Sequence, residues 1–438
     1  MPQREDDMKK RQARRQAMQA KRNAQRKRMK RLLILACVIA VASVVGLFYL
    51  IGTAEPGSES VAVQPAKPEQ TKPPETKPVA LAFQDPKTVI HIKAAGDLNV
   101  TNSVIDAGLS IAGYDFSKAF QDVAAILADA DLTLLNFEGN IYGEPYGSQT
   151  GSAPIQLLHG LRACGVDMVQ MANSCAVNNG LNGLHATLQA IRSAGIEPVG
   201  AYSSQAEFNL SKGYTITDIQ GVRVAFVAFT KGLGGRGLPD GNENLVNLLY
   251  TDYATTYKEI DRDRITKILK NVELEDPDLT VALVHWGSEY HEDISATQQS
   301  IVSLMKKQGV DVILGTHPHT LQPIVFDEAA GTLVCYSLGD FFGDADRGAT
   351  NYSIILDLEI TKDADAGTTK VTGFSYTPIY TVREEECVDG KRRVVRIEKA
   401  MEAHNGNYLD GVTKACYSAM DYALTRIEQR IVMPEESK

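Results

Sequence analysis

The sequence predicts an α/β fold with a largely parallel sheet and flanking helices, preceded by one N-terminal transmembrane helix. The first observation is a run of 20 uncharged residues at 32–51. The second is an alternation of short apolar runs with helical periodicity from about Thr88 to Glu359, which is typical of βαβ units. The third is a set of polar side chains at the ends of the predicted strands, where open α/β sheets bind ligands.

The N-terminal segment predicts how the chain is oriented in the cell membrane. Residues 1–31 contain 13 Lys and Arg against three acids, a charge of +10. The uncharged run at 32–51 follows and is long enough to cross a bilayer once as a helix. Because basic flanks stay on the cytoplasmic side, we expect a cytoplasmic N-terminus and an extracellular main domain. A cleaved signal peptide is the alternative, but its apolar region would be shorter.

Residues 52–87 are predicted to form a stalk, because residues 52–82 are rich in Pro, Glu, Lys, Ser and Thr and too poor in apolar side chains to fold. Since the whole chain carries −9 and the first 31 residues carry +10, the remainder carries −19. This acidic balance argues against nucleic acid as a partner. Five cysteines follow residue 51 with no C-x-x-C pattern, so some disulfides and a fully reduced set are both acceptable.

The predicted core domain covers residues 88–400. Apolar runs predict strands at Val89–Ala95, Leu132–Phe137, Met168–Met171, Val222–Phe229, Leu279–His285, Val310–Leu314, Leu333–Ser337 and Tyr352–Ile360. Apolar residues at helical spacing predict helices at Phe116–Ala128, Ile155–Ala163, Gly183–Ser193, Tyr253–Val272 and Ser295–Lys307. Two later strands, Lys370–Tyr380 and Arg392–Glu398, are expected to be antiparallel and to form an edge or a second sheet. Residues 401–438 form a C-terminal segment, in which Met420–Ile431 is predicted to be an amphipathic helix.

Five of the predicted strand ends carry side chains that can bind a metal ion. The residues are Asp97, Glu138, the block Asn173 to Cys175, His285, and the pair His317 and His319. One such residue at a strand end is usually a cap or turn former, but five ends with such groups are difficult to explain in this way. A His-x-His pair can direct two imidazoles at one ion, whereas the alternative is a solvated loop in which Pro318 fixes a turn. The pattern predicts a metal or anion site and leaves open whether it holds one ion or two.

Six short motifs lie at these strand ends and shortly after them. They are Gly96-Asp97, Asn136-x-Glu138, Ala172-Asn173, His285-Trp-Gly-x-Glu-Tyr290, Gly315-Thr-His-Pro-His319 and Tyr336-Ser-Leu-Gly339. Together they resemble the CapA/PgsA family of capsule-biosynthesis proteins, whose domain is similar to the calcineurin-like metallophosphoesterases, and the likeness covers roughly Val89 to Ile360. It implies a metallophosphoesterase-like layered sheet core. It also implies a membrane-anchored external protein that takes part in making or exporting poly-γ-glutamate or a related capsule polymer.

The resemblance further implies a site for two divalent ions, such as Mn, Zn or Fe. Asp97 and His319 would hold one ion, and His285 and His317 would hold the other. Glu138 would bridge them, in the arrangement that clamps a phosphoryl oxygen and acidifies a water molecule. The groups implied to support these ligands or to face the substrate are Glu289 and Tyr290.

One block departs from the family pattern. Where the family has Asn-Asn-His-x-x-Asp, this chain has Asn173-Ser174-Cys175-x-x-Asn178. The second Asn of the pattern is the expected ligand and the His is the expected proton donor, so Ser174 and Cys175 are poor replacements. Asp340 stands where the family usually has Asn. These changes predict a degenerate metal site, unless Asn173 shifts by one place to supply the missing amide.

Three functions follow from this pattern. The first is a membrane-anchored accessory protein of an exported anionic polymer, which works with other capsule synthesis and export proteins and has weak or absent catalysis. The second is an active metal-dependent phosphoesterase or hydrolase of the cell envelope. The third is a cell-envelope binding module in which the histidines hold one structural ion. The family likeness favours the first, and the loss of the expected proton donor argues against the second.

Overall fold

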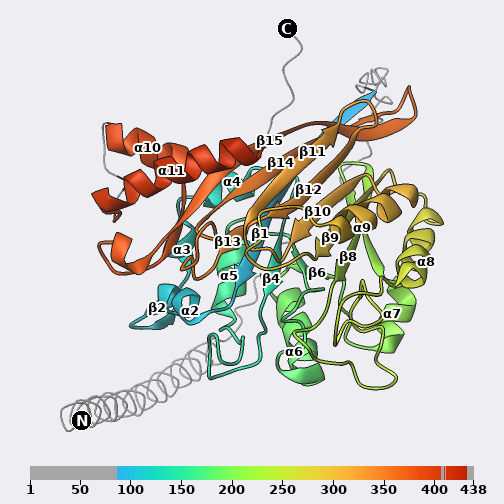
Figure 1. Ribbon diagram of the computed structural model, residues 1–438, viewed down its shortest axis with the longest axis horizontal. Coiled ribbons are helices and arrows are strands. Elements are labelled where there is room, and N and C mark those ends of the chain that lie inside the picture. Colours follow the sequence, from blue (N-terminus) through green and yellow to red (C-terminus); the bar gives the residue numbers. More distant parts are fainter. Residues whose placement is uncertain (1–85, 406–408, 410, 432–438) are drawn as a thin grey trace, which may run out of the picture. The chain divides into compact units, whose positions relative to one another are not determined.

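The computed structural model describes residues 86–405, 409 and 411–431, and Figure 1 shows how their helices and strands are arranged. The basic segment at 1–31, the predicted membrane span at 32–51, the stalk up to residue 85 and residues 432–438 lie outside the described residues. Among the described helices, none is both long and apolar enough to cross a bilayer. The described residues form a mixed α/β core of two large sheets with flanking helices.

The first large sheet has eight strands, in the order β16-β15-β14-β1-β4-β5-β6 with β13 also paired to β1. Its members are β1 (Lys87–Asn99), β4 (Leu132–Glu138), β5 (Met168–Gln170), β6 (Glu197–Val199), β13 (Asp340–Phe342), β14 (Tyr352–Asp363), β15 (Thr368–Val382) and β16 (Arg393–Arg396). The neighbours β1, β4, β5 and β6 are parallel, whereas β14, β15 and β16 are antiparallel to their neighbours. The predicted antiparallel edge is therefore confirmed, but it begins one strand earlier than expected.

The second large sheet has six strands, in the order β11-β12-β10-β9-β8-β7. Its members are β7 (Tyr214–Ile219), β8 (Val222–Thr230), β9 (Leu279–His285), β10 (Val312–Thr316), β11 (Leu321–Asp327) and β12 (Thr332–Leu338). The four central strands are parallel, and the edge strands β7 and β11 are antiparallel to their neighbours. A short additional sheet pairs β2 (Leu109–Ser110) with β3 (Gly113–Tyr114).

The two large sheets share one apolar core, and the side chains of β8 alternate between this core and a second one. Val224 and Phe226 of β8 pack in the same core as Ile92 of β1. Ala225 and Val227 point to the other face of β8, into a second core formed with α8 and α9. A strand buried on both faces needs apolar residues at nearly every position, which explains the continuous apolar run of β8.

Helices flank these sheets. They are α2 (Asn102–Gly108), α3 (Ser117–Phe120), α4 (Ala124–Ala128), α5 (Gln156–Ala163), α6 (Gly180–Ser193), α7 (Gln205–Ser211), α8 (Arg262–Glu273), α9 (Ala296–Lys307), α10 (Ile397–Asn405), α11 (Lys414–Arg430) and the 3₁₀ turn η1 (Glu384–Glu386). In Figure 1, α10 and α11 lie side by side and α11 runs along β14 and β15, which it contacts. The predicted C-terminal amphipathic helix is therefore confirmed, although it begins earlier, at Lys414.

The helix predicted at 253–272 is wrong in its first half, because only α8 is helical. The Asp252 carboxylate accepts hydrogen bonds from the backbone N–H of Lys258 at 3.1 and 2.9 Å, which closes this stretch into a turn. The Asp261 side chain then accepts from the backbone N–H of Arg264 at 3.0 Å and caps the start of α8. Two carboxylates that bond to the backbone therefore override the apolar periodicity of the segment.

The other element predictions hold with shifted boundaries. All eight strands predicted in the core are present, and helices are confirmed near 155–163, 183–193 and 295–307. The helix predicted at 116–128 is divided into α3 and α4, and the strand predicted at 392–398 ends at Arg396, where α10 takes over. Helix α10 therefore crosses the predicted domain boundary at residue 400. The five cysteines of the described residues are all free thiols, which agrees with the reduced alternative.

Candidate metal centre

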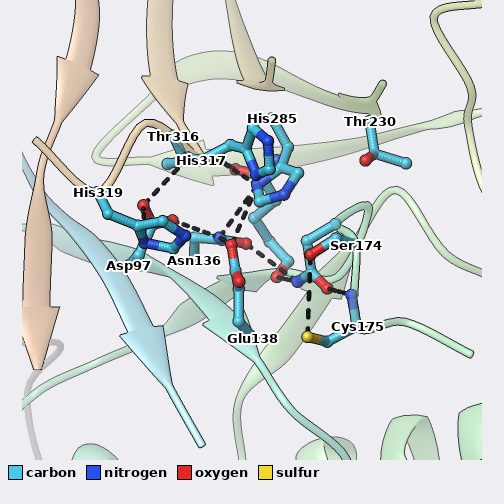
Figure 2. Close-up of polar contacts among 12 residues, drawn as sticks. Asp97, Asn136, Glu138, Ser174, Cys175, Thr230, His285, Thr316, His317 and His319 are labelled. Atoms are coloured by element: carbon cyan, nitrogen blue, oxygen red, sulfur yellow. Dashed lines mark hydrogen bonds and ion pairs between the residues drawn. The ribbon is translucent and has the colours of Figure 1, made fainter. Parts of the chain in front are cut away.

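The polar ends of four strands from both sheets converge on one buried cluster (Figure 2). Asp97 of β1 lies beside Asn136 of β4 in the first sheet, and His285 of β9 lies beside Thr316 of β10 in the second. Two glycines allow the close approach of the chains that carry them. A Cβ on Gly96 would lie 1.7 Å from the carbonyl oxygen of Gly339, and a Cβ on Gly315 would lie 2.0 Å from that of Tyr336. Side chains at either position would separate the strands that form the cluster.

One half of the cluster consists of Glu138, His285 and His317. Each offers a ligand atom, and these atoms lie within 4.8 Å of one another. The two imidazole rings are 4.5 Å apart between centroids, and Nδ1 of His285 lies 3.3 Å from Oε1 of Glu138. Burial lowers the pKa of both histidines well below the usual range, so both imidazoles are neutral, as metal ligands must be.

Two nitrogens of this half are left without a hydrogen bond. Nε2 of His285 and Nδ1 of His317 are buried, and neither has a partner among the described residues. A buried nitrogen without a partner is costly, because it has lost its bonds to water and gained none in exchange. A metal ion is a natural partner for such a nitrogen. These residues therefore fit a divalent ion.

The other half consists of Asp97, His319 and Asp340, whose ligand atoms also lie within 4.8 Å of one another. Nδ1 of His319 lies 2.7 Å from Oδ1 of Asp340 and 3.5 Å from Oδ2 of Asp97. Burial raises the pKa of Asp97 to about 6 and also raises that of Asp340. Burial alone would lower the pKa of His319, but Asp340 and the other carboxylates outweigh it and raise that pKa well above its usual range. Without a metal ion, the His319 imidazolium therefore supplies the positive charge that these carboxylates require.

Glu138 and Asn136 connect the two halves. Nδ2 of Asn136 donates hydrogen bonds to Oδ1 of Asp97 at 2.6 Å and to Oε1 of Glu138 at 3.1 Å. Burial raises the pKa of Glu138 well above its usual range, and the nearby Asp97 raises it further. Two buried carboxylates so close together are stabilised by a shared cation. This position agrees with the bridging role that the family resemblance implies for Glu138.

The loop between β10 and β11 directs both of its histidines into the cluster. His317 and His319 have φ angles of 90° and 58°, in the left-handed region that residues other than glycine rarely adopt. The backbone N–H of His317 donates to Oδ2 of Asp97 at 3.0 Å, which ties this loop to β1. Both side chains are buried, with exposed fractions of 6% and 5%. The two imidazoles therefore converge on the cluster, and the loop that carries them is buried rather than solvated.

The Asn173 side chain forms hydrogen bonds to its neighbours in this arrangement. Its Nδ2 donates to Oδ1 of Asn136 at 3.0 Å and to the carbonyl of Phe137 at 2.8 Å, and its Oδ1 accepts from the backbone N–H of Cys175 at 3.1 Å. Its amide therefore holds Asn136 and the turn, and the shift by one place stays a prediction. Cys175 faces the same cavity as Glu138, but burial raises the pKa of its thiol to about 12. The Cys175 thiol belongs to none of the groups of His, Cys, Asp and Glu ligand atoms found among the described residues.

Glu289 and Tyr290 lie over the cluster. Glu289 is exposed, and its carboxylate forms a group within 4.8 Å with ligand atoms of His317 and His319. The Tyr290 ring stacks on His319 at 5.7 Å between centroids, and the Arg347 guanidinium lies 4.1 Å from the centre of that ring. These side chains therefore face both the ligands and the space above them.

Two cavities open over the cluster and share Ser174 and Glu289 in their linings. The smaller, of 310 Å³, is bordered by His317, Lys231 and Tyr257. The larger, of 440 Å³, is bordered by residues that include Glu138, Cys175, Tyr290, His319, Asp340 and Arg347. A substrate that occupied both cavities would contact both halves of the cluster.

Two residues of this site, Asp340 and Lys231, were not identified as such from the sequence. Asp340 was noted only as a change from the family, yet β13 brings it into register with Asp97 of β1. Lys231 directly follows β8, so a search for polar residues at the end of every predicted strand would have identified it. Its Nζ donates to the carbonyl of Gly287 at 2.6 Å, and burial lowers the pKa of the amine. This cation lines the smaller cavity together with His317.

Comparison with known proteins found relatives among capsule-biosynthesis proteins of two Bacillus species. PGA biosynthesis protein CapA of Bacillus subtilis (strain 168) is 28% identical over 268 residues, which cover 59% of this chain and 64% of that protein. Capsule biosynthesis protein CapA of Bacillus anthracis is 25% identical over 260 residues, which cover 58% of this chain and 60% of that protein. The match thus spans less than two thirds of either relative.

Solved structures give weaker similarity. A phosphatase from Mycoplasma pneumoniae is 13% identical with a TM-score of 0.40, over 67% of this chain and 94% of that chain. A hypothetical protein from Thermus thermophilus is 16% identical with a TM-score of 0.36, over 66% of this chain and 98% of that chain. The family described as bacterial capsule synthesis protein PGA_cap matches residues 91–345, a region that contains every residue of the cluster. The chain belongs to this family of bacterial capsule synthesis proteins.

Proposed function

We propose that this chain is a membrane-anchored extracellular protein that takes part in the synthesis or export of an anionic capsule polymer such as poly-γ-glutamate. The observation that carries the proposal is that the family match at 91–345 contains the whole buried ligand cluster. Other capsule synthesis and export proteins are the proposed partners, together with the polymer itself. The basic segment and the apolar run before residue 52 support the membrane anchor.

The cluster is proposed to hold two divalent ions, one in each group of three ligands. When bound, such ions polarise a phosphoryl or carbonyl oxygen and lower the pKa of a water molecule. Asn136 keeps the carboxylates of Asp97 and Glu138 in place by donating a hydrogen bond to each. Lys231 and Arg347 offer positive charge to an anionic substrate on either side of the cluster. Three overlapping ligand groups, in which His317 and His319 each take part twice, offer more ligand atoms than a single structural ion needs.

Catalysis is proposed to be weak or absent, because the expected proton donor is missing. Cys175 occupies that position, and a thiol with a pKa raised to about 12 is a poor acid near neutral pH. An active phosphoesterase or hydrolase of the cell envelope is the second candidate. Asp340 favours it, because its carboxylate adds a ligand atom beside those of Asp97 and His319.

The proposed role predicts loss of surface polymer when the gene is removed from its bacterium. The wild-type chain should restore the polymer, whereas a chain with Asp97→Asn and His285→Ala should not, because each half of the cluster loses a ligand. The measurement is the glutamate released from washed cell surfaces by acid hydrolysis. Replacement of the exposed His159 by alanine is the matched control and should restore the polymer fully. Normal polymer in the deletion strain would refute the role.

The proposed topology predicts that the main domain is accessible from outside the cell. A protease added to intact cells stripped of their wall should cut the stalk at 52–87, since extended segments rich in Pro and Glu are readily cleaved. The product to detect is a released fragment that begins within the stalk, identified by mass spectrometry. A cytoplasmic protein should remain intact as the control for lysis. Complete protection of the domain would contradict an extracellular location.

A further inference from the structure

A further cavity lies between α7 and α8, which are neighbours at the edge of the fold (Figure 1). Its volume is 500 Å³, within the range of about 300–1,000 Å³ that is typical of ligand pockets. None of its lining residues borders either of the cavities over the metal cluster. Phe208 and Ile268 are the apolar residues of its lining, and the other side chains there are polar.

Three cations and no acid line this cavity, namely Lys212, Arg264 and Lys267. Nε of Arg264 lies 3.4 Å from Asp261, and its charge also acts on Glu243. Nζ of Lys212 lies 3.4 Å from Glu275, so both of these cations have carboxylate neighbours outside the lining. Lys267 is exposed and has no ion pair among the described residues. Because the chain after residue 31 carries −19, an anionic ligand is repelled by most of its surface and needs a local excess of cations to bind.

Four amide side chains line the same cavity, namely Gln205, Asn209, Asn244 and Asn271. Three of them form a chain of hydrogen bonds, in which Asn244 donates to Gln205 at 3.1 Å and Gln205 donates to Asn209 at 2.8 Å. These bonds leave Oδ1 of Asn244 and Nδ2 of Asn209 without a protein partner among the described residues. A side-chain amide offers the same donor and acceptor as a peptide group, so it is complementary to an amide linkage. Cations alone would suit any anion, whereas the amides select a ligand that contains amide bonds.

The backbone at Lys212 gives independent support. This residue ends α7 with a φ of 56°, a left-handed conformation that glycine or asparagine usually fills at a helix C-terminus. Gly213 follows, and a Cβ there would lie 2.9 Å from the Ile268 side chain, which shows how closely this turn packs on α8. Lys212 therefore keeps a cation in the lining of the cavity at a position that glycine would fill with less strain.

We propose that this cavity binds a strand that carries carboxylates on amide linkages, the chemistry of a glutamate polymer, at a site separate from the metal cluster. The cations would pair with the carboxylates, and the amide side chains would bond to the linkages between them. This inference rests on the proposed function, because the capsule polymer is the source of such a strand. It gives the chain a place to hold the polymer that does not depend on bound metal.

The test is a binding titration of the full-length chain in detergent with a fluorescently labelled pentamer of γ-linked glutamate. The same pentamer with its carboxylates amidated should bind far more weakly. Lys267→Gln should weaken binding about threefold and its combination with Arg264→Gln about tenfold, as expected for exposed charge pairs. Lys270→Gln is the matched control, since Lys270 lies on the same helix, is exposed and does not line the cavity. It should leave binding unchanged.

Lys212→Gly separates binding from folding. Because glycine relieves the left-handed strain, the variant should melt at the same temperature as the wild type or higher, yet bind the pentamer more weakly. The pentamer should bind equally well with and without a chelator, because the cavity does not use the metal cluster.

Several outcomes would overturn the proposal. Weakening by Lys270→Gln as large as that by Lys267→Gln would mean a diffuse charge effect. Displacement of the pentamer by inorganic phosphate at the same concentration would mean a site for single anions. Wild-type binding that Lys267→Gln and Lys212→Gly leave unchanged would refute this cavity while polymer binding by the chain stands. No binding by the wild type would refute the cavity together with direct polymer binding, and the surface-polymer assay would still test the wider role.

Discussion

Replacement of both His317 and His319 by alanine is expected to remove most of the divalent metal bound by the purified full-length chain. His317 and His319 each belong to one half of the cluster and share a third ligand group with Glu289, so the double variant removes a ligand from every group. Apart from His285, no other imidazole among the described residues belongs to one of these ligand groups, so no third ring already in place can replace the two that are lost. Metal per chain should be measured by mass spectrometry of protein that has been loaded with Mn²⁺ or Zn²⁺ and desalted.

The matched control is the pair His159→Ala and His185→Ala, which removes two exposed histidines from helices and should leave the metal content unchanged. Loss of His319 leaves buried carboxylates without their imidazolium partner, so the double variant is also expected to be less stable. Melting with and without a chelator separates the two effects. The wild type should lose stability when the metal is removed, because a ligand that binds only the folded state stabilises it. Full metal content in a folded double variant would eliminate this site.

Restoration of the family residues with Ser174→Asn and Cys175→His is expected to raise the rate of phosphodiester hydrolysis. The wild-type chain should hydrolyse a chromogenic phosphodiester poorly with Mn²⁺ or Zn²⁺ supplied, because a thiol with a pKa of about 12 does not donate its proton readily. A positioned general acid contributes about 10²–10⁴-fold, which sets the upper range of the gain. The position suits this role, since Cys175 borders the same cavity as Glu138 and His319.

The single variants serve as controls, since Ser174→Asn should restore a ligand without a proton donor and produce a smaller gain. If the Asp340 carboxylate already occupies the position in which the restored amide would bind metal, the gain in hydrolysis rate should be smaller. Rapid turnover by the wild type that survives Cys175→Ala would show that the proton comes from another group. Glu289 would then be the first candidate, because it borders both cavities, and the hydrolase would replace the accessory protein as the favoured function.

The central strands and the ligand cluster could be predicted because both depend on local sequence. Strands buried on two faces must be apolar almost throughout, so β8, β9 and β10 are visible as runs of Val, Leu, Ile and Ala. Parallel strands end at the same edge of a sheet, so polar residues just after such runs are brought together. Five predicted ligands, Asp97, Glu138, His285, His317 and His319, meet for this reason.

Edge elements were not visible in the same way. Strands β7 and β11 are partly exposed and antiparallel, and their mixed polarity does not differ from that of a loop. The turn before α8 depends on bonds from Asp252 to backbone N–H groups, which apolar periodicity cannot reveal. The roles of Asp340 and Asn173 also needed the structure, because one depends on the register of β13 with β1 and the other on where an amide bonds.

The sequence by itself determined the succession of strands and helices in outline, the ligand types and the departure at Cys175, because these follow from residue identity and from short-range pattern. Only the tertiary structure decided which ligands lie close enough together to share an ion. It also revealed that two imidazole nitrogens are buried without partners among the described residues, and that Lys212, Arg264 and Lys267 come together between two helices. Such facts depend on distances between side chains far apart in the chain, and those distances are set by the packing of the whole core.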